Sequence, residues 1–210
     1  MRPVARVDDR VLAAVRKQLD GWRELLAGGA GRVGWKAAWH MAEVEALIGD
    51  GELVIGHLTT ATQLEPGGTY RGGGVAMRAE TEVVILAGAD GGVAALGLGL
   101  EIVDVGVEPR VMEESVAGNV LHRAFALGPV GPLGDEATMT VNGEVRHRAP
   151  VTGDHAATLR AVARWLTAAG ERLEPGDVVF AGSLNHVPVA SGDHVEAAIS
   201  GLGAVGATIV

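Results

Sequence analysis

Residues 75–105 read VAMRAETEVVILAGADGGVAALGLGLEIVDV, and this stretch decides the fold that the sequence predicts. Two runs rich in valine, isoleucine and leucine, Val75–Ala87 and Val93–Val105, flank the glycine-rich segment Gly88–Gly92. Apolar runs of this length that are separated by turn residues are typical of paired strands. We therefore expect an antiparallel hairpin at this place in the chain.

Three glutamates interrupt this apolar hairpin. Glu80 and Glu82 stand two residues apart in the first run, so their side chains point to the same face of a strand. Glu101 lies in the second run, in an otherwise apolar stretch. Carboxylates that converge from paired strands repel one another without a cation, and their oxygens are suitable ligands for Mg²⁺ or Mn²⁺. The alternative is a solvated strand face, because Glu-x-Glu is a common pattern.

The rest of the chain alternates short apolar runs with turn residues. Helical spacing of apolar residues predicts helices at Asp8–Ala27, Ala42–Ile48, Glu113–Val120 and His155–Ala169. Further strands are expected at Arg32–Ala38, Val54–Gly56, Ala124–Gly131, Glu136–Arg148 (turning at Asn142-Gly143), Val178–Ala181 and Val195–Val210. One helix followed mostly by strands and one late helix indicates an α+β protein with a mixed β-roll or barrel-like sheet, not a doubly wound sheet.

The composition limits the classes of protein to which the chain can belong. A length of 210 residues suffices for one core, so we expect a single domain over 1–210, with 1–30 as an N-terminal helical segment. The net charge of -9 argues against a nucleic-acid or anionic-membrane partner. The absence of cysteine excludes disulfides, zinc–thiolate sites and cysteine nucleophiles. No signal peptide or membrane-spanning stretch is visible, and we expect a cytoplasmic protein.

A single lysine stands among apolar residues in the first predicted strand. Lys36 follows Gly34 and Trp35 and precedes two alanines. Burial in such surroundings would lower the pKa of the amine, as a proton-carrying lysine requires. The alternative is a surface lysine whose alkyl chain covers a strand edge.

A small-residue segment, Ala181-Gly182-Ser183-Leu184-Asn185, follows the apolar strand at 178–180. A turn of this kind exposes backbone N–H groups and a hydroxyl that can hold a carboxylate, and the alternative is a simple turn. The chain has no Gly-x-Ser-x-Gly motif, and the glycines at 72–74 lack the spacing of a phosphate or dinucleotide loop.

The order of these motifs resembles one family. The motifs that carry the resemblance are Gly34-Trp35-Lys36, Gly56-His57-Leu58-Thr59, Arg78-Ala79-Glu80-Thr81-Glu82, Leu100-Glu101-Ile102-Val103-Asp104, Ala117-Gly118-Asn119, Phe125–Gly128, Gly176-Asp177, Ala181-Gly182-Ser183-Leu184, Gly192-Asp193 and Gly201-Leu202-Gly203. In this order, over nearly the whole chain, they resemble the 2-keto-4-pentenoate hydratase branch of the fumarylacetoacetate hydrolase superfamily.

The resemblance implies a metal-dependent hydro-lyase that adds water to a 2-hydroxy-2,4-dienoate in aromatic catabolism. It implies Mg²⁺ or Mn²⁺ bound by Glu80, Glu82 and Glu101, with Lys36 moving protons. The partner would be a small 2-oxo acid or dienol carboxylate, and the protein would form a homo-oligomer. The substrate-binding residues would be Arg78, Asn119, His122, Ser183 and Leu184.

The chain departs from the family pattern around the expected pocket. Gly118 stands where relatives carry an aspartate, Met77 replaces the usual proline, and His122 and Arg123 occupy positions of small residues. An added imidazole and guanidinium with one acid fewer would favour a substrate with a second anionic group. The alternative is that His122 and Arg123 turn outward.

Three other functions are also compatible with the sequence. A 2-oxo diacid decarboxylase of the same fold would use the same metal-stabilised enolate. Hydrolysis of a carbon–carbon bond in an acylpyruvate would need a histidine–glutamate pair, for which His40 and Glu43 are the candidates. A repurposed member, either a cyclase or a partner subunit acting on a larger intermediate, would explain the changed pocket residues.

Overall fold

Two β-sheets and three helices make up the computed structural model of this chain, which describes residues 8–38, 52–106 and 111–210. The larger sheet has the order β2-β1-β10-β5-β6-β7-β3. Its strands are β1 (Arg32–Ala38), β2 (Val54–Thr59), β3 (Gln63–Leu64), β5 (Met77–Ala87), β6 (Val93–Asp104), β7 (His122–Val130) and β10 (Val178–Pro188). The smaller sheet, in the order β4-β12-β11-β8-β9, contains β4 (Thr69–Tyr70), β8 (Glu136–Val141), β9 (Glu144–Pro150), β11 (His194–Ile199) and β12 (Gly203–Ile209).

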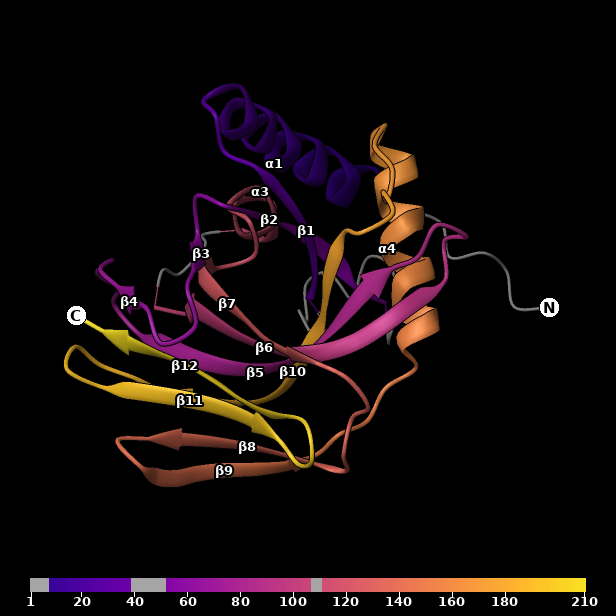
Figure 1. Cartoon of the computed structure of the whole chain (residues 1–210). Coiled ribbons are helices and arrows are strands. Elements are labelled where there is room, and N and C mark those ends of the chain that lie inside the picture. The colour runs from indigo at the N-terminus through magenta and orange to yellow at the C-terminus, as the bar shows by residue number, and fades with distance from the viewer. Residues whose placement is uncertain (1–7, 39–51, 107–110) are drawn as a thin grey trace.

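The helices and the smaller sheet cover opposite parts of the larger sheet, as Figure 1 shows. The helices are α1 (Asp9–Ala27), α3 (Met112–Ala117) and α4 (His155–Ala169). One apolar core lies between these helices and the larger sheet, around Trp22, Trp35 and Trp165. A second core, which includes Leu100 and Met139, lies between the two sheets. The expected α+β fold with a rolled, mixed sheet is confirmed.

The predicted hairpin at 75–105 is present. β5 and β6 pair antiparallel from Met77 opposite Asp104 to Ala87 opposite Val93. β10 lies on the other side of β5, so the two strands of the hairpin occupy the middle of the larger sheet. This position explains the apolar character of both runs, because a central strand is covered on its two faces.

Several other predicted elements agree with the structure. α4 has the predicted bounds, with Asp154 accepting a hydrogen bond from the amide of Ala157 at its start. Asn142 and Gly143 both have positive φ, as a tight hairpin turn between β8 and β9 requires. The predicted helix Ala42–Ile48 lies outside the described residues. None of the described helices is long and apolar enough to cross a membrane.

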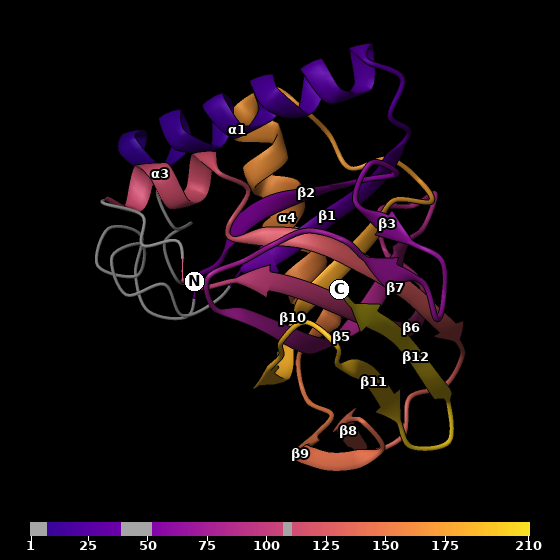
Figure 2. The ribbon, with the colours of Figure 1, turned by 90° about the vertical axis from the view of Figure 1, so that its left-hand side faces the viewer.

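Two of the predicted boundaries that are wrong lie close to the three glutamates or to Lys36. The segment after residue 180 was expected to be a turn, but β10 continues to Pro188 across irregular pairing with β5 near Ser183. The predicted helix at Glu113–Val120 ends at Ala117. A left-handed turn follows it, in which Asn119, Val120 and Leu121 have φ values of 63°, 51° and 65°. Figure 2 shows α3 beside the beginning of α1, where Arg10 donates to Glu113.

Candidate metal centre

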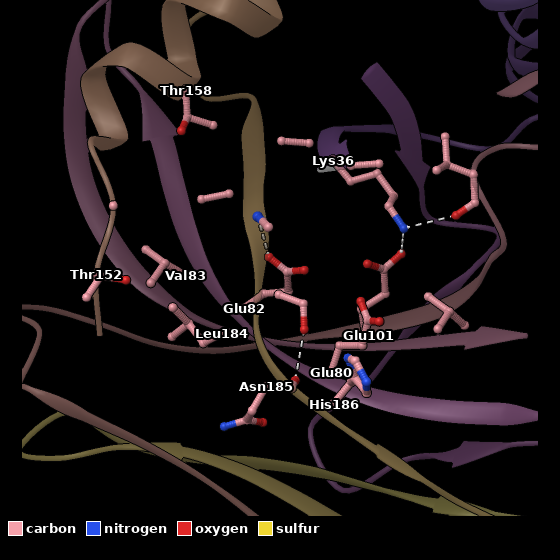
Figure 3. Close-up of a pocket in the computed structure, with 18 of the residues that line it drawn as sticks. Lys36, Glu80, Glu82, Val83, Glu101, Thr152, Thr158, Leu184, Asn185 and His186 are labelled. Carbon is pink, nitrogen blue, oxygen red and sulfur yellow. Dashed lines mark hydrogen bonds and ion pairs between the residues drawn. The ribbon is translucent and has the colours of Figure 1, made fainter. Parts of the chain in front are cut away.

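The hairpin brings the three glutamates together. Glu80 is the direct partner of Glu101 across β5 and β6, and Glu82 lies two residues farther along β5. One carboxylate oxygen of each residue lies within 4.8 Å of the others, and Figure 3 shows the three side chains gathered at one place. Glu82 and Glu101 are 2% and 0% exposed. Glu82 and Glu101 therefore do not belong to a solvated strand face.

Electrostatics make this cluster a poor place for three ionised acids alone. Burial raises the pKa of Glu80 to about 7, and Glu101 adds to the rise. Burial, with the negative charges of Glu101 and Glu80, also raises the pKa of Glu82 well above its usual range. Both shifts mean that negative charge at these positions is costly unless a cation balances it. The donor set therefore fits a hard divalent cation that prefers oxygen ligands.

Lys36 reaches the same cluster from β1. Its amine lies 2.5 Å from Oε1 of Glu101 and also donates to the carbonyl oxygen of Val120. Gly56 on β2 leaves room for this side chain, since a Cβ at that position would lie 2.7 Å from Cγ of Lys36. The side chain is buried, so Lys36 is not the surface lysine of the alternative interpretation.

The predicted direction of the Lys36 pKa is wrong for the protein without a bound cation. Burial is the largest single influence and lowers the pKa, as expected. The charges of Glu101, Glu80 and Glu82 together outweigh it and raise the pKa above its ordinary value. Lys36 is therefore an ammonium group in this state, suited to giving a proton rather than taking one.

Hydrogen bonds hold two of the three carboxylates in place. The backbone N–H of Gly182 donates to Oε2 of Glu82 at 2.7 Å. Oε1 of Glu101 accepts from Lys36 and from Nδ1 of His122, which lies 2.7 Å away. These contacts hold the pKa of Glu101 below its usual value although burial, the largest influence, acts to raise it. Oε2 of Glu101 is buried and has no hydrogen-bond partner among the described residues.

The cluster opens into a cavity of about 900 Å³. Its inner wall carries Lys36 and the three glutamates. Its outer wall comes from β9, the segment that joins β9 to α4, the beginning of α4, and β10. This wall contributes the polar residues His147, Thr152, Asp154, His155, Thr158 and His186. In Figure 3, His186 lies beside Glu80, while Thr152 and Thr158 lie on the side away from Lys36.

Three of the predicted substrate-binding residues lie at or near this cavity. Ser183 and Leu184 line it, but the hydroxyl of Ser183 donates to the carbonyl of Asn185. The Gly182 amide, which was expected to hold a substrate, is bound to Glu82 instead. Arg78 shares the face of Glu80 and pairs with Val103, which lines the cavity. Its charge helps to lower the pKa of His186, after the larger effect of burial.

Asn119 and His122 lie elsewhere than predicted. The Asn119 side chain accepts from the N–H of His57 and donates to its carbonyl, so its amide is bound to the backbone of β2. His122 neither lines the cavity nor turns outward, because β7 begins next to β6 with its imidazole directed at Glu101. Burial lowers the pKa of His122. Its Nε2 lies 3.0 Å from Oγ1 of Thr62.

Sequence reasoning missed several residues of the site. His186 could have been found, because it lies on β10 next to Glu80, and a longer predicted strand would have placed it there. Thr62, His147 and His155 carry no local signal. His40 and Glu43, the candidates for a hydrolase pair, lie outside the described residues.

One family model matches part of the chain. Residues 111–210 match the family described as fumarylacetoacetate (FAA) hydrolase C-terminal. Lys36 and the three glutamates precede the matched residues, whereas Asn119, His122, Ser183 and Leu184 fall within them. No curated protein sequence matches this chain.

Solved structures extend the likeness to the whole fold. A 4-oxalocrotonate decarboxylase from Pseudomonas putida G7, complexed with magnesium and adipate, is 22% identical with a TM-score of 0.81, covering 94% of this chain and 85% of that one. A fumarylpyruvate hydrolase from Pseudomonas aeruginosa, in complex with Mn²⁺ and pyruvate, is 18% identical with a TM-score of 0.61, covering 86% and 90%.

A third similar structure is that of an isomerase. A 2-hydroxyhepta-2,4-diene-1,7-dioate isomerase from Mycobacterium marinum is 17% identical with a TM-score of 0.60, covering 86% of this chain and 75% of that one. The fold of the fumarylacetoacetate hydrolases thus serves a decarboxylase, a hydrolase and an isomerase. These likenesses show the fold of this chain, and its reaction has to be argued from the site.

Proposed function

We propose that this protein is a divalent-metal-dependent lyase that acts on a 2-oxo acid or its dienol, and that it adds water to a 2-hydroxy-2,4-dienoate. One observation carries the proposal: three carboxylates with oxygens within 4.8 Å of one another lie beside a buried lysine amine, at the inner end of a cavity. Such a cluster is costly for a structural role alone, because buried charges need a partner.

The donor atoms fit Mg²⁺ or Mn²⁺. All three side chains of the cluster offer oxygen, and Oε2 of Glu101 is a buried acceptor with no other partner among the described residues. Two similar solved structures hold magnesium and Mn²⁺ together with a small carboxylate. A bound divalent cation would supply Lewis-acid stabilisation for the enolate of a 2-oxo acid.

The protein side chains would then orient the substrate and move protons. Lys36, an ammonium group held against Glu101, is placed to give a proton to the substrate carbon chain and to take one back. Ser183 and Leu184 would contact the bound acid from β10. Arg78 would provide positive charge near the cavity.

Decarboxylation of a 2-oxo diacid is a second candidate, favoured by a different observation. Arg78 and His147 both help to lower the pKa of His186, so three basic side chains lie close to one another, and His186 is the strand partner of Glu80. Such a group would attract a second carboxylate at the far end of a substrate. The decarboxylase with a TM-score of 0.81 is complexed with a diacid, adipate.

A metal titration tests the shared part of both proposals. Isothermal titration with MnCl₂ is expected to give one site per chain for the wild type and none for Glu82→Gln. Glu136→Gln, which changes an exposed ion pair with Arg148 on the smaller sheet, is the matched control and should bind like the wild type. Equal binding by Glu82→Gln and the wild type would contradict the proposed site.

Two assays separate the reactions. Loss of dienoate absorbance with a 2-hydroxy-2,4-dienoate monoacid reports hydration, and release of CO₂ from a 2-oxo diacid reports decarboxylation. The hydratase proposal predicts turnover of the monoacid without CO₂ release. Release of CO₂ from the diacid with no reaction of the monoacid would replace it with the second candidate.

A further inference from the structure

We infer that His122 is a positioning residue for the metal centre: its Nδ1–H holds Oε1 of Glu101, so that Oε2 is the oxygen offered to the cation, and Thr62 fixes the imidazole tautomer that does this. The inference rests on the proposed function, because it concerns the same metal centre. It assigns a role to a side chain that does not touch the substrate cavity.

The contacts of His122 leave no nitrogen for another role. Nδ1 lies 2.7 Å from Oε1 of Glu101, and Nε2 lies 3.0 Å from Oγ1 of Thr62. The side chain is 1% exposed and does not line the cavity, whereas Glu101 does. A residue placed in this way can neither bind the cation directly nor exchange a proton with a substrate.

The two partners specify which nitrogen carries the proton. An ionised carboxylate only accepts hydrogen bonds, so Nδ1 has to be the donor to Glu101. In the neutral ring Nε2 is then an acceptor. The hydroxyl of Thr62 can donate to it at 3.0 Å, in preference to the carbonyl oxygen of Thr59, which lies farther away at 3.4 Å. Without this hydroxyl, the ring would lose the contact that favours the required tautomer.

His122 and Lys36 together determine the orientation of the Glu101 carboxylate. Both donate to the same oxygen, Oε1, and they come from different strands, β7 and β1. With two donors on Oε1, rotation of the carboxylate would break both contacts. Oε2 is therefore held toward the cluster as a buried acceptor without another partner among the described residues. Partners of this kind commonly improve the affinity of a metal site about 10–100-fold.

The left-handed turn before β7 positions one group that contacts Lys36 and another that contacts Glu101. Val120 directs its carbonyl at the Lys36 amine, and His122 follows two residues later. Asn119 binds the backbone of His57 through its side chain and thereby anchors the turn to β2. Three successive residues with positive φ are unfavourable for side chains such as valine and leucine, and such strain persists where surrounding contacts determine it.

Mn²⁺ affinity of folded variants tests the role. Dissociation constants would be measured by electron paramagnetic resonance for the wild type, His122→Leu, His122→Asn and Thr62→Val, well below each melting temperature. Leucine fills the space without a donor, whereas the Asn amide nitrogen stands as many bonds from Cα as Nδ1 does. We expect a dissociation constant about 10–100-fold higher for His122→Leu. His122→Asn should restore affinity to within about threefold of the wild type, and Thr62→Val should weaken it less than His122→Leu does.

The results separate the positioning role of His122 from the existence of the metal site. Wild-type affinity in His122→Leu, or equal weakening in the Leu and Asn variants, would overturn the positioning role and leave the metal site intact. Failure of the wild type to bind Mn²⁺ would overturn the proposed function and this inference with it. A second readout needs no metal: ¹⁵N chemical shifts of the imidazole should show the Nδ1–H tautomer in the wild type. The Nε2–H tautomer there would contradict the inference.

Discussion

The two sheets of this protein differ in whether they bury polar side chains. In the smaller sheet, β8 and β11 alternate between buried and more exposed residues, and every fully buried side chain described there is apolar. In the larger sheet, β2 is buried along its whole length, and the interior holds Lys36, Glu82, Glu101 and His122. The smaller sheet contributes a packing surface and an edge of the cavity, while the larger sheet holds the chemistry.

The two sheets also differ in how their buried side chains affect the stability of the fold. Apolar burial in the smaller sheet is favourable at each position, whereas each buried charge in the larger sheet requires a partner. Lys36, His122 and the Gly182 amide provide those partners for the glutamates. Substitutions around the glutamates of the larger sheet should therefore change activity, and those in the apolar interior of the smaller sheet should change stability alone.

The largest expected effect is that of Lys36→Met on turnover. Removing the amine should lower kcat by about 10²–10⁴-fold, because general acid–base groups contribute on that scale. Mn²⁺ binding should persist, since Lys36 is not a ligand, but its affinity should fall because Oε1 of Glu101 loses one of its two donors. Lys17→Met on the exposed side of α1 is the control, as these are the two lysines of the chain. Steady-state kinetics with wild-type turnover in Lys36→Met would reassign the lysine to structure.

A core substitution in the larger sheet should affect both stability and the site. Phe180 packs edge-on against Phe125 in a small apolar cluster, and it is the strand partner of Lys36. Phe180→Ala should cost about 3–5 kcal/mol in the free energy of unfolding by urea. Because the cavity lies beside Lys36, kcat of the folded fraction should fall as well. Unchanged kinetics would show that packing and chemistry are independent here.

The matching substitution in the smaller sheet should affect stability alone. Met139 on β8 is fully buried between the sheets, and Met139→Ala should cost about 2–5 kcal/mol in urea unfolding. Its neighbour Thr140 points to the other face, so Thr140→Ala should cost about 0.5 kcal/mol or less. Both variants should keep wild-type Mn²⁺ affinity. A weakened metal site in Met139→Ala would contradict the division between the sheets.

A pH dependence caused by His57 in the larger sheet should be smaller than the effects of the two core substitutions. Burial, with a smaller contribution from His122, lowers the pKa of His57 to about 4. The unfolded chain, with a His57 pKa of about 6.5, takes up the proton first as the pH falls. His57 therefore causes no loss of stability above pH 6.5, and a loss that grows as the pH falls from 6.5 toward 4.

Urea unfolding at pH 6.5 and pH 5 measures this loss. The contribution of His57 should be about 2 kcal/mol, because one pKa unit corresponds to about 1.4 kcal/mol. His57→Leu should remove this part of the pH dependence. The same substitution at exposed His194 of β11 is the control. Identical pH dependence in wild type and His57→Leu would show that the pKa of the buried imidazole is not lowered.

The sequence predicted those parts of the molecule that depend on local periodicity. Alternation placed Glu80 and Glu82 on one face, and the apolar run around Glu101 placed it on the partner strand. Asn142-Gly143 predicted the β8–β9 turn because both residues tolerate positive φ. The bounds of α4 followed from the helical spacing of its apolar residues.

The parts that sequence could not predict depend on contacts between distant segments. His122 meets Thr62, which is 60 residues away, and no local pattern connects them. The direction of the Lys36 pKa depends on a competition between burial and three carboxylates, of which the sequence around Lys36 shows only the burial. Ser183 was assigned to a turn because strand irregularities at glycine and serine look like turns in sequence.

The left-handed turn at 119–121 also has a consequence for protein engineering. Valine and leucine are poor residues for positive φ, with a cost of about 1–2 kcal/mol each relative to right-handed backbone. A library selected for thermostability alone would be expected to enrich glycine at positions 120 and 121. Glycine would relieve the backbone but give the segment more freedom, just where it supports Lys36 and His122. Stabilisation of this protein is therefore better directed at the smaller sheet, where added rigidity and activity are not in competition.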